Sequence, residues 1–245
     1  MYLRLSLLLC FLGGTAFAQI EDSVLLQILR NYQATLQSEI HPNGLQTILI
    51  EGEGQKVGGE KQRFKTIRKY PNKIRTKTIR ADGVEVIAGS NGKDRWGRAE
   101  NNERVHFYKQ KVSGPIDWLP IVSDFENHLL RALKGDKKVR LTRLPNQTPA
   151  DSDLLLHVIE AKDDRDLKFT YYLSSHSDCL VRTQIEPKNG PAMEVHYSNF
   201  RSVEGHELLH RVKLYEAGEL ISDETYLSIQ VNKFIYDFLF EEPSY

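Results

Sequence analysis

The chain has 245 residues, of which 40% are hydrophobic and 27% are charged, and its 33 basic residues balance its 33 acidic residues. This composition is typical of a folded globular protein and excludes a disordered chain. The balanced charge also gives no overall attraction to nucleic acid, so we expect no nucleic-acid partner. The length suffices for one large domain or two small ones.

The first 18 residues have the pattern of a cleavable secretory signal peptide. Arg4 supplies a positive charge, residues 5–12 form a short apolar run, and residues 16–18 (AFA) form a small-x-small cleavage site. The apolar run is shorter than the roughly 20 residues that a membrane-spanning helix needs. Leu9 precedes Cys10, where a lipoprotein acylation site would have a small residue. We therefore expect export to the periplasm without a lipid anchor.

Removal of residues 1–18 leaves residues 19–245 with 32 basic and 33 acidic residues and with Cys179 as the single cysteine. A single cysteine cannot form an internal disulfide, so stability must come from a hydrophobic core. We expect the Cys179 thiol to pack on a strand. No clear linker or repeat divides residues 19–245, which predicts a single domain.

Two segments have the apolar spacing of helices. In residues 22–40, apolar side chains recur at helical intervals, and Asp22 or Ser23 can cap the first turn. In residues 123–135, Ser123 and Glu126 have the spacing of a capping box, and Gly135 stands where a helix would end. An apolar stretch precedes this second helix, which predicts that the helix plugs or covers a sheet face.

The rest of the mature chain has the pattern of short strands joined by tight turns. Asp82-Gly83 and Asn91-Gly92 are hairpin signals on either side of residues 84–90. Later strands include one over residues 193–202. Such strands form an antiparallel meander, and a sheet of so many strands curls. A curled sheet with a helix against its concave side encloses an apolar hollow.

Basic side chains alternate along two neighbouring strands, at Lys61, Arg63, Lys65, Lys69, Lys73, Arg75 and Lys77. A three-residue loop at residues 71–73 places these side chains on one face and Phe64 and Ile74 on the other, whereas a two-residue loop would mix the faces. The basic face is either an ordinary solvated surface or a patch for anionic lipid headgroups or an acidic partner.

One string has the form of a zinc-peptidase motif, H-E-x-x-H, at His206-Glu207-Leu208-Leu209-His210. Such enzymes hold both histidines on one face of a helix, with the glutamate directed at a metal-bound water. The flanks predict a strand instead, because Gly205 precedes the string and residues 208–215 have the period of a strand. We therefore expect neither a metal nor a catalytic site here and keep a zinc metallopeptidase as a remote alternative.

Several segments together resemble the LolA-like proteins, a periplasmic family of outer-membrane lipoprotein-sorting proteins and carriers. They are residues 69–75 (KYPNKIR), 91–96 (NGKDRW), 125–130 (FENHLL), 195–205 (VHYSNFRSVEG), 209–212 (LHRV), 229–233 (IQVNK) and 240–243 (FEEP). The resemblance covers most of the mature chain. The basic residues of 61–77 and His206-Glu207 are departures from the family pattern.

The residue patterns alone predict an α+β domain of about eleven or twelve strands and two principal helices. The resemblance implies that the sheet is a curled, incompletely closed antiparallel β-barrel with helices covering the concave face. It implies a non-enzymatic carrier, with no cofactor, that shields the acyl chains of lipoproteins or other lipids. Membrane-bound donor and acceptor proteins would be its partners, and the carrier itself would be a monomer. The alternative is a non-enzymatic envelope sensor or interaction module on the same fold.

Nine apolar side chains are the candidates for lining or covering the hollow. They are Phe64, Ile74, Trp96, Trp118, Leu119, Ile121, Phe125, Leu129 and Leu133. Burial of an acyl chain is favourable by roughly 0.8 kcal/mol per CH₂, so an apolar hollow would hold lipid without a catalyst. The alternative is that these side chains form a filled core.

Overall fold

The computed structural model describes residues 20, 22–37, 44–101, 104–111, 127–150, 152–163, 168–188 and 190–242. The predicted signal peptide lies outside these residues, as do Trp118, Leu119, Ile121 and Phe125. Within the described ranges, none of the helices has the length and apolarity needed to span a bilayer.

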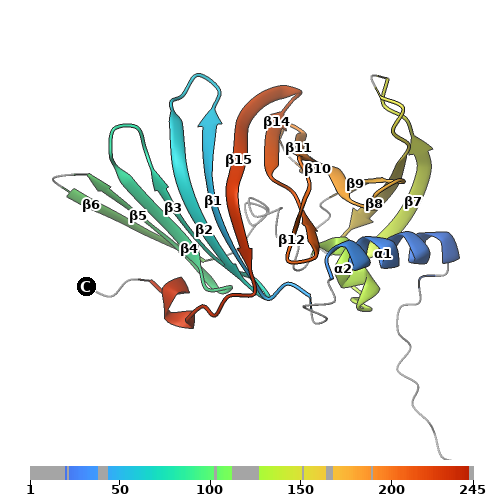
Figure 1. The fold of residues 1–245 in the computed structure, drawn as a ribbon, viewed down its shortest axis with the longest axis horizontal. Helices are drawn as coiled ribbons and strands as arrows, with labels where there is room; N and C mark the ends of the chain where they lie inside the picture. Colours follow the sequence, from blue (N-terminus) through green and yellow to red (C-terminus); the bar gives the residue numbers. More distant parts are fainter. Residues whose placement is uncertain are drawn as a thin grey trace, which may run out of the picture.

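Thirteen of the described strands form one antiparallel sheet, in the order β6-β5-β4-β3-β2-β1-β15-β14-β11-β10-β9-β8-β7 (Figure 1). The first six are β1 (Thr47–Lys56), β2 (Lys61–Lys69), β3 (Lys73–Ile79), β4 (Glu85–Ser90), β5 (Asp94–Asn101) and β6 (Arg104–Lys111). The other seven are β7 (Arg140–Gln147), β8 (Leu156–Lys162), β9 (Lys168–Ser174), β10 (Leu180–Glu186), β11 (Met193–Ser198), β14 (Arg211–Glu216) and β15 (Glu219–Val231).

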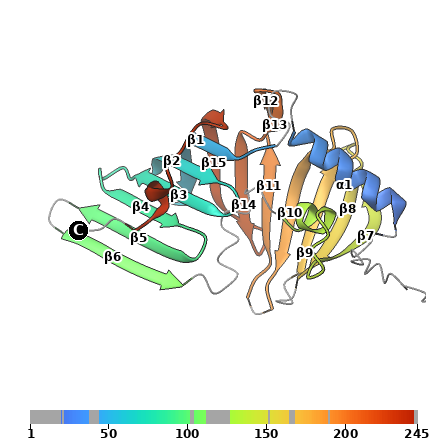
Figure 2. The ribbon, with the colours of Figure 1, turned by 90° about the horizontal axis from the view of Figure 1, so that it is seen from below.

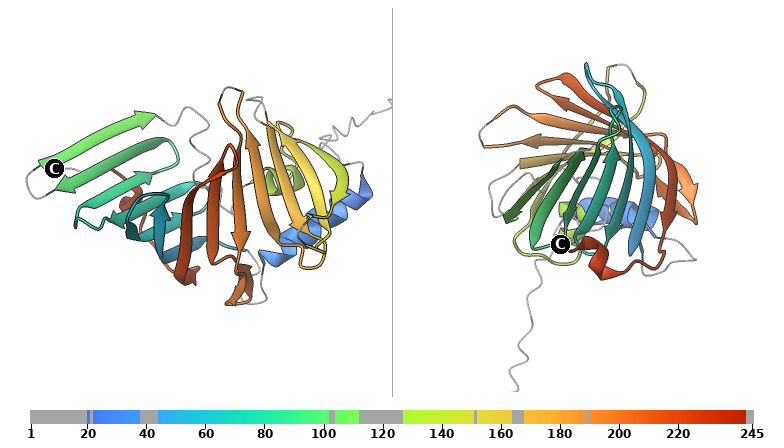
Figure 3. Two further views of the ribbon diagram at one scale, coloured as in Figure 1. Left: turned by 90° about the horizontal axis from the view of Figure 1, so that it is seen from above. Right: turned by 90° about the vertical axis from the view of Figure 1, so that its left-hand side faces the viewer.

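The predicted meander is confirmed in both halves of this sheet, because β1 to β6 and β7 to β11 each pair in chain order. The 13-residue strand β15 joins the halves by pairing with β1 on one side and β14 on the other. The edge strands β6 and β7 do not pair with each other, so the sheet is not closed into a barrel. The sheet is curled, as the end-on view in Figure 3 shows.

The prediction of about eleven or twelve strands is too low. The largest local difference falls in residues 193–202, where the expected single strand is divided into β11 and β12 (Arg201–Val203). Asn199 between them adopts a left-handed backbone conformation with φ 56°, which ends β11. Strand β12 then pairs with β13 (His206–Leu208) in a separate two-stranded sheet.

Both predicted helices are present and are shorter than expected. Helix α1 (Ser23–Thr35) begins at Asp22, whose carboxylate accepts hydrogen bonds from two backbone N–H groups of the first turn. Helix α2 (His128–Leu133) begins at Asn127, which has an extended backbone and caps the helix with its side-chain oxygen. The predicted start at Ser123 lies outside the described residues. Gly135 follows α2 with φ 84°, as the sequence predicts for a helix end.

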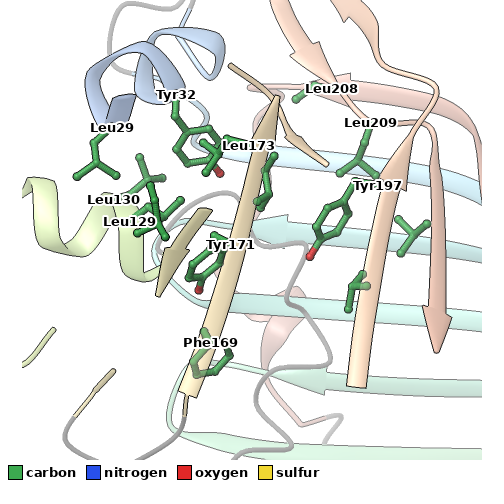
Figure 4. Close-up of a cluster of buried hydrophobic side chains, with 14 of the residues drawn as sticks. Leu29, Tyr32, Leu129, Leu130, Phe169, Tyr171, Leu173, Tyr197, Leu208 and Leu209 are labelled. Atoms are coloured by element: carbon green, nitrogen blue, oxygen red, sulfur yellow. The ribbon is translucent and has the colours of Figure 1, made fainter. Parts of the chain in front are cut away.

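The main core lies between the two helices and one face of β8 to β11. Four buried side chains of α1 (Leu25, Ile28, Leu29 and Tyr32) and two of α2 (Leu129 and Leu130) belong to it. They meet strand side chains that include Ile159, Phe169, Tyr171 and Leu173 (Figure 4). We call this face of the sheet the inner face and the opposite face the outer face.

Strand pairing extends the inner face across the sheet, because residues directly opposite each other in antiparallel strands share a face. The chain of opposite residues runs from Ile159 and Tyr171 through Thr183 and Val195 on β10 and β11. Val195 stands opposite Leu214 on β14, which shares its face with Val212, and Val212 stands opposite Glu224 on β15. Tyr226, two residues further along β15, shares the face of Glu224 and stands opposite Gly52, which in turn stands opposite Phe64 on β2. Phe64 and Tyr171 therefore belong to the same face.

Candidate functional site

Phe64 and Ile74 lie on the inner face, on the half of the sheet formed by β1 to β5. Residues 70–72 form a three-residue connection between β2 and β3, and Lys69 stands opposite Lys73. Odd-numbered residues of both strands therefore share the outer face, and even-numbered residues share the inner face. The predicted separation of the basic side chains from Phe64 and Ile74 is confirmed.

Phe64 is fitted closely into the sheet. Gly52 stands opposite it on β1, and a Cβ atom at Gly52 would lie 2.6 Å from Cζ of Phe64. The ring also meets Tyr226 edge-on, with centroids 5.8 Å apart and an interplanar angle of 83°. Phe64 packs against the main core from a half-buried position, so the apolar part of the inner face continues from that core onto β2.

The described helices do not extend over this half of the sheet. Helices α1 and α2 lie against β7 to β10, and β1 to β5 continue to one side of them (Figures 2 and 3). Five further inner-face side chains there are half-buried, namely Ile74, Thr76, Thr78, Val86 and Ala88. In the described part of the chain, this surface is apolar or hydroxyl-bearing and has no helix over it.

Charged side chains also lie on the inner face, among them Arg68 on β2, Arg95 on β5 and Glu224 on β15. Burial raises the pKa of the Glu224 carboxyl, and the positive charge of Arg68 partly offsets that effect. Arg68 is itself buried on β2, and the hydroxyls of Thr66 and Thr76 lie 3.1 Å apart beside it. An amphiphile on this face would therefore find an apolar strip and a few polar groups.

Trp96 does not share this face, which corrects the prediction. The inner-face residue Ile74 stands opposite Ser90 of β4, so Ser90 is also on the inner face and its neighbour Gly89 is on the outer face. Trp96 stands opposite Gly89 and therefore lies on the outer face. The indole lies across Gly89 on the outer face, where a Cβ atom would overlap with it. Its Nε1–H donates to the carbonyl of Phe240 at 3.0 Å, at the end of the short 3₁₀ helix η2 (Asp237–Phe240). Trp96 therefore holds the C-terminal segment against the outer face.

Leu129 and Leu133 of α2 lie in the other half of the molecule. Leu129 has 0% exposed surface between α1 and the strands, and Leu133 packs against the same core from a partly buried position. The filled-core alternative therefore describes Leu129. A role of any of the nine residues in lipid binding stays a prediction.

Several contacts that fix α2 have no signal in the sequence, because they join residues far apart in the chain. Nδ1 of His128 lies 2.8 Å from the hydroxyl of Tyr171, and its Nε2 lies 3.3 Å from a carboxylate oxygen of Asp163. The amide of Asn127 donates to the hydroxyl of Tyr32 on α1 at 2.7 Å. Helix α2 is thus tied both to the sheet and to α1.

The H-E-L-L-H string is not helical, as the sequence predicts. His206 and Leu208 are buried on β13, and Glu207 between them is exposed because side chains alternate along a strand. Nδ1 of His206 lies 3.0 Å from the carbonyl oxygen of Leu36, and Nδ1 of His210 lies 3.1 Å from that of Leu208. Burial lowers the pKa of His210. In the described ranges, no group of three metal-ligating side chains is present.

A small pocket with a cavity volume of about 20 Å³ lies beside α1, far smaller than a small-molecule site and with room for about one water molecule. Its lining residues are Tyr32, Thr35, Leu36, Cys179, Leu180, Phe200, Glu207 and Leu209. Cys179 is buried, and it lies directly before β10, whereas the sequence predicts that it lies on the strand itself. The pocket is separate from the strip at Phe64 and Ile74.

An open, curled antiparallel sheet with two helices packed on one face defines the class of fold. A LolA superfamily protein from Nitrosomonas europaea shares it, with a TM-score of 0.57 and 13% sequence identity, over 88% of this chain and 96% of that protein. The fold of this chain is therefore LolA-like, which confirms the resemblance at the level of structure.

A conserved uncharacterized protein from Thermus thermophilus is similar at a lower level. Its TM-score is 0.41 and its identity 8%, over 89% of this chain and 93% of that protein. No protein-family model matches the chain, and no curated protein sequence matches it. Function therefore has to be argued from the site, since a shared fold does not fix it.

Proposed function

We propose that this protein is a periplasmic carrier that shields the acyl chains of lipoproteins or other lipids on the inner face of its sheet during envelope sorting. One observation carries the proposal. The apolar part of the inner face continues from the packed core through Tyr226 to Phe64, and the half-buried side chains of Ile74, Val86 and Ala88 lie on the same face, beyond the area under the described helices. The LolA-like fold and the signal-peptide pattern support the same function and location.

The chemistry of such a carrier is simple. An acyl chain on the strip gains roughly 0.8 kcal/mol for each CH₂ removed from water, so neither a catalyst nor a cofactor is required. In this proposal α1 and α2 cover the concave face, and the apolar residues predicted ahead of α2 complete the cover. Membrane-bound donor and acceptor proteins would load and unload the carrier.

A matched pair of substitutions on β3 tests the proposed site. Thr78 lies on the inner face directly opposite Phe64, and the next residue, Ile79, is exposed on the outer face. Thr78→Glu and Ile79→Glu add the same charge one residue apart. We expect Thr78→Glu to weaken binding of a fluorescent phosphatidylcholine analogue by at least about tenfold, since it places a carboxylate beside the acyl chain.

Ile79→Glu should leave that affinity within about twofold of the parent, because a surface charge changes little at a distance. The fluorescence titration is run together with a thermal melt of each variant. Equal affinities of the two folded variants would contradict the proposed site. Absence of binding in the parent protein would favour an envelope sensor or interaction module instead.

A further inference from the structure

Three aromatic side chains project from the C-terminal segment that follows β15. Phe234 is 80% exposed, Tyr236 is 59% exposed and Phe238 is 68% exposed. The rings contact one another, with centroids 4.8 Å apart for the first pair and 5.6 Å for the second. We call these three residues the aromatic ridge. Adjacent exposed aromatics of this kind mark an interaction surface, since isolated apolar residues are the rule elsewhere on a protein surface.

The residues between the three rings hold the segment in place. Ile235 is buried, and its carbonyl oxygen accepts a hydrogen bond from Nζ of Lys69 at 2.8 Å. Asp237 pairs with Lys69 at 2.8 Å and with Lys73 at 3.1 Å. Ile235 and Asp237 therefore contact the end of β2 and β3, whereas the three rings between and beside them are exposed. The C-terminal segment that carries the ridge, with η2 in it, lies beside the ends of the first strands (Figure 1).

The surface next to the ridge is positively charged. Seven basic side chains of β2 and β3 lie on the outer face, where the acidic side chains of β1, β4 and η2 are Glu51, Glu53, Glu85 and Asp237. Among these side chains, basic residues outnumber acidic ones by three. Lys69 and Lys73 share a single carboxylate, that of Asp237, so these three side chains keep a net positive charge beside the ridge.

We propose that the aromatic ridge docks this protein on the surface of an anionic phospholipid bilayer. Aromatic rings favour the boundary between headgroups and acyl chains, and lysines beside them meet the phosphates. The ridge projects from the surface, which suits insertion into a bilayer better than binding of a peptide in a groove. The proposal does not depend on the cargo that the inner face holds.

Flotation of the full mature protein with vesicles tests this docking. We expect binding to phosphatidylcholine vesicles that contain roughly 30% phosphatidylglycerol and weak binding to pure phosphatidylcholine. Salt at about 1 M should release the protein, since the Debye length falls to about 3 Å. The triple variant Phe234→Ser, Tyr236→Ser, Phe238→Ser should lose roughly a hundredfold in vesicle affinity, because it lacks the three rings whose transfer from water into the bilayer favours binding.

The control replaces three exposed apolar residues elsewhere, as Val57→Ser, Leu155→Ser, Leu227→Ser, and should bind as the parent does. Asp237→Asn should bind anionic vesicles several-fold more tightly, because it removes a negative charge between two lysines. The proposal is overturned if the parent does not float with anionic vesicles at low salt, or if the ridge variant floats as well as the parent. It is also overturned if the control loses as much affinity as the ridge variant, or if Asp237→Asn binds no more tightly than the parent.

Discussion

His206 connects two parts of the molecule that are far apart in the sequence. It is fully buried on β13, and its Nδ1–H donates to the carbonyl of Leu36, the residue that caps the C-terminus of α1. A carbonyl can only accept a hydrogen bond, so Nδ1 of His206 carries the proton. The imidazole therefore fastens the β12–β13 hairpin to the end of the first helix.

His206→Ala should lower the free energy of unfolding by about 1–3 kcal/mol, because the Leu36 carbonyl loses its donor in a part-buried position. Glu207→Ala is the matched control on the next residue, which is exposed, and should change that free energy by no more than about 0.5 kcal/mol. Urea denaturation measures both values. In a zinc peptidase His206 would bind the metal and Glu207 would act on the metal-bound water. Stoichiometric zinc in the parent protein that is lost in His206→Ala would therefore contradict the structural role of His206.

At the scale of elements, α2 is a short helix with unusually specific attachments. Its six residues cannot form a stable helix alone, so its position depends on tertiary contacts. Asn127 supplies two of them, since its oxygen caps α2 at the N–H of Leu130 and its nitrogen donates to Tyr32 of α1. One side chain therefore both starts α2 and joins it to the first helix.

Asn127→Ala should destabilise the protein by roughly 1–3 kcal/mol, which combines the loss of a cap with the loss of a hydrogen bond. Tyr32→Phe removes the hydrogen bond between the helices and keeps the cap, so its effect should be smaller. Thermal melts of both variants provide the comparison. An equal or larger loss in Tyr32→Phe would show that the cap at Asn127 contributes nothing.

Elements were easier to predict from the sequence than the faces on which their residues lie. The period of apolar residues and the turn signals located α1, α2 and most strands, because these patterns are local. For Phe64 and Ile74 the sequence left two alternatives, because the pairing of their strands depends on the length of a single loop, and the structure shows the one that places both on the same face. The sequence could not show on which face Trp96 lies, since this depends on the register of two further strand pairings and on the distant carbonyl of Phe240.

The candidate site shows the same limit. Tyr226, which meets Phe64 edge-on, comes from β15, a strand that is near in the sheet and distant in the chain. The burial that raises the pKa of Glu224 is likewise a tertiary effect. No local sequence pattern indicates the contact of Tyr226 with Phe64 or the burial of Glu224, because both features arise only when β15 pairs with β1.

At the scale of the whole molecule, β15 makes one sheet from two meanders and leaves both edge strands unpaired. The two halves of the sheet differ in what covers their inner face. Helices α1 and α2 fill the inner face of β8 to β11, whereas the half with Phe64 and Ile74 has no described helix over it. A carrier needs this combination, in which a rigid packed half supports an apolar surface that a ligand can occupy.

Native mass spectrometry of the protein purified from the periplasm without detergent tests the carrier function most directly. We predict a species heavier than the polypeptide by the mass of a bound lipid, and we predict that Thr78→Glu loses this species while Ile79→Glu keeps it. The polypeptide mass alone in the parent protein, or bound zinc in place of lipid, would contradict the proposed function.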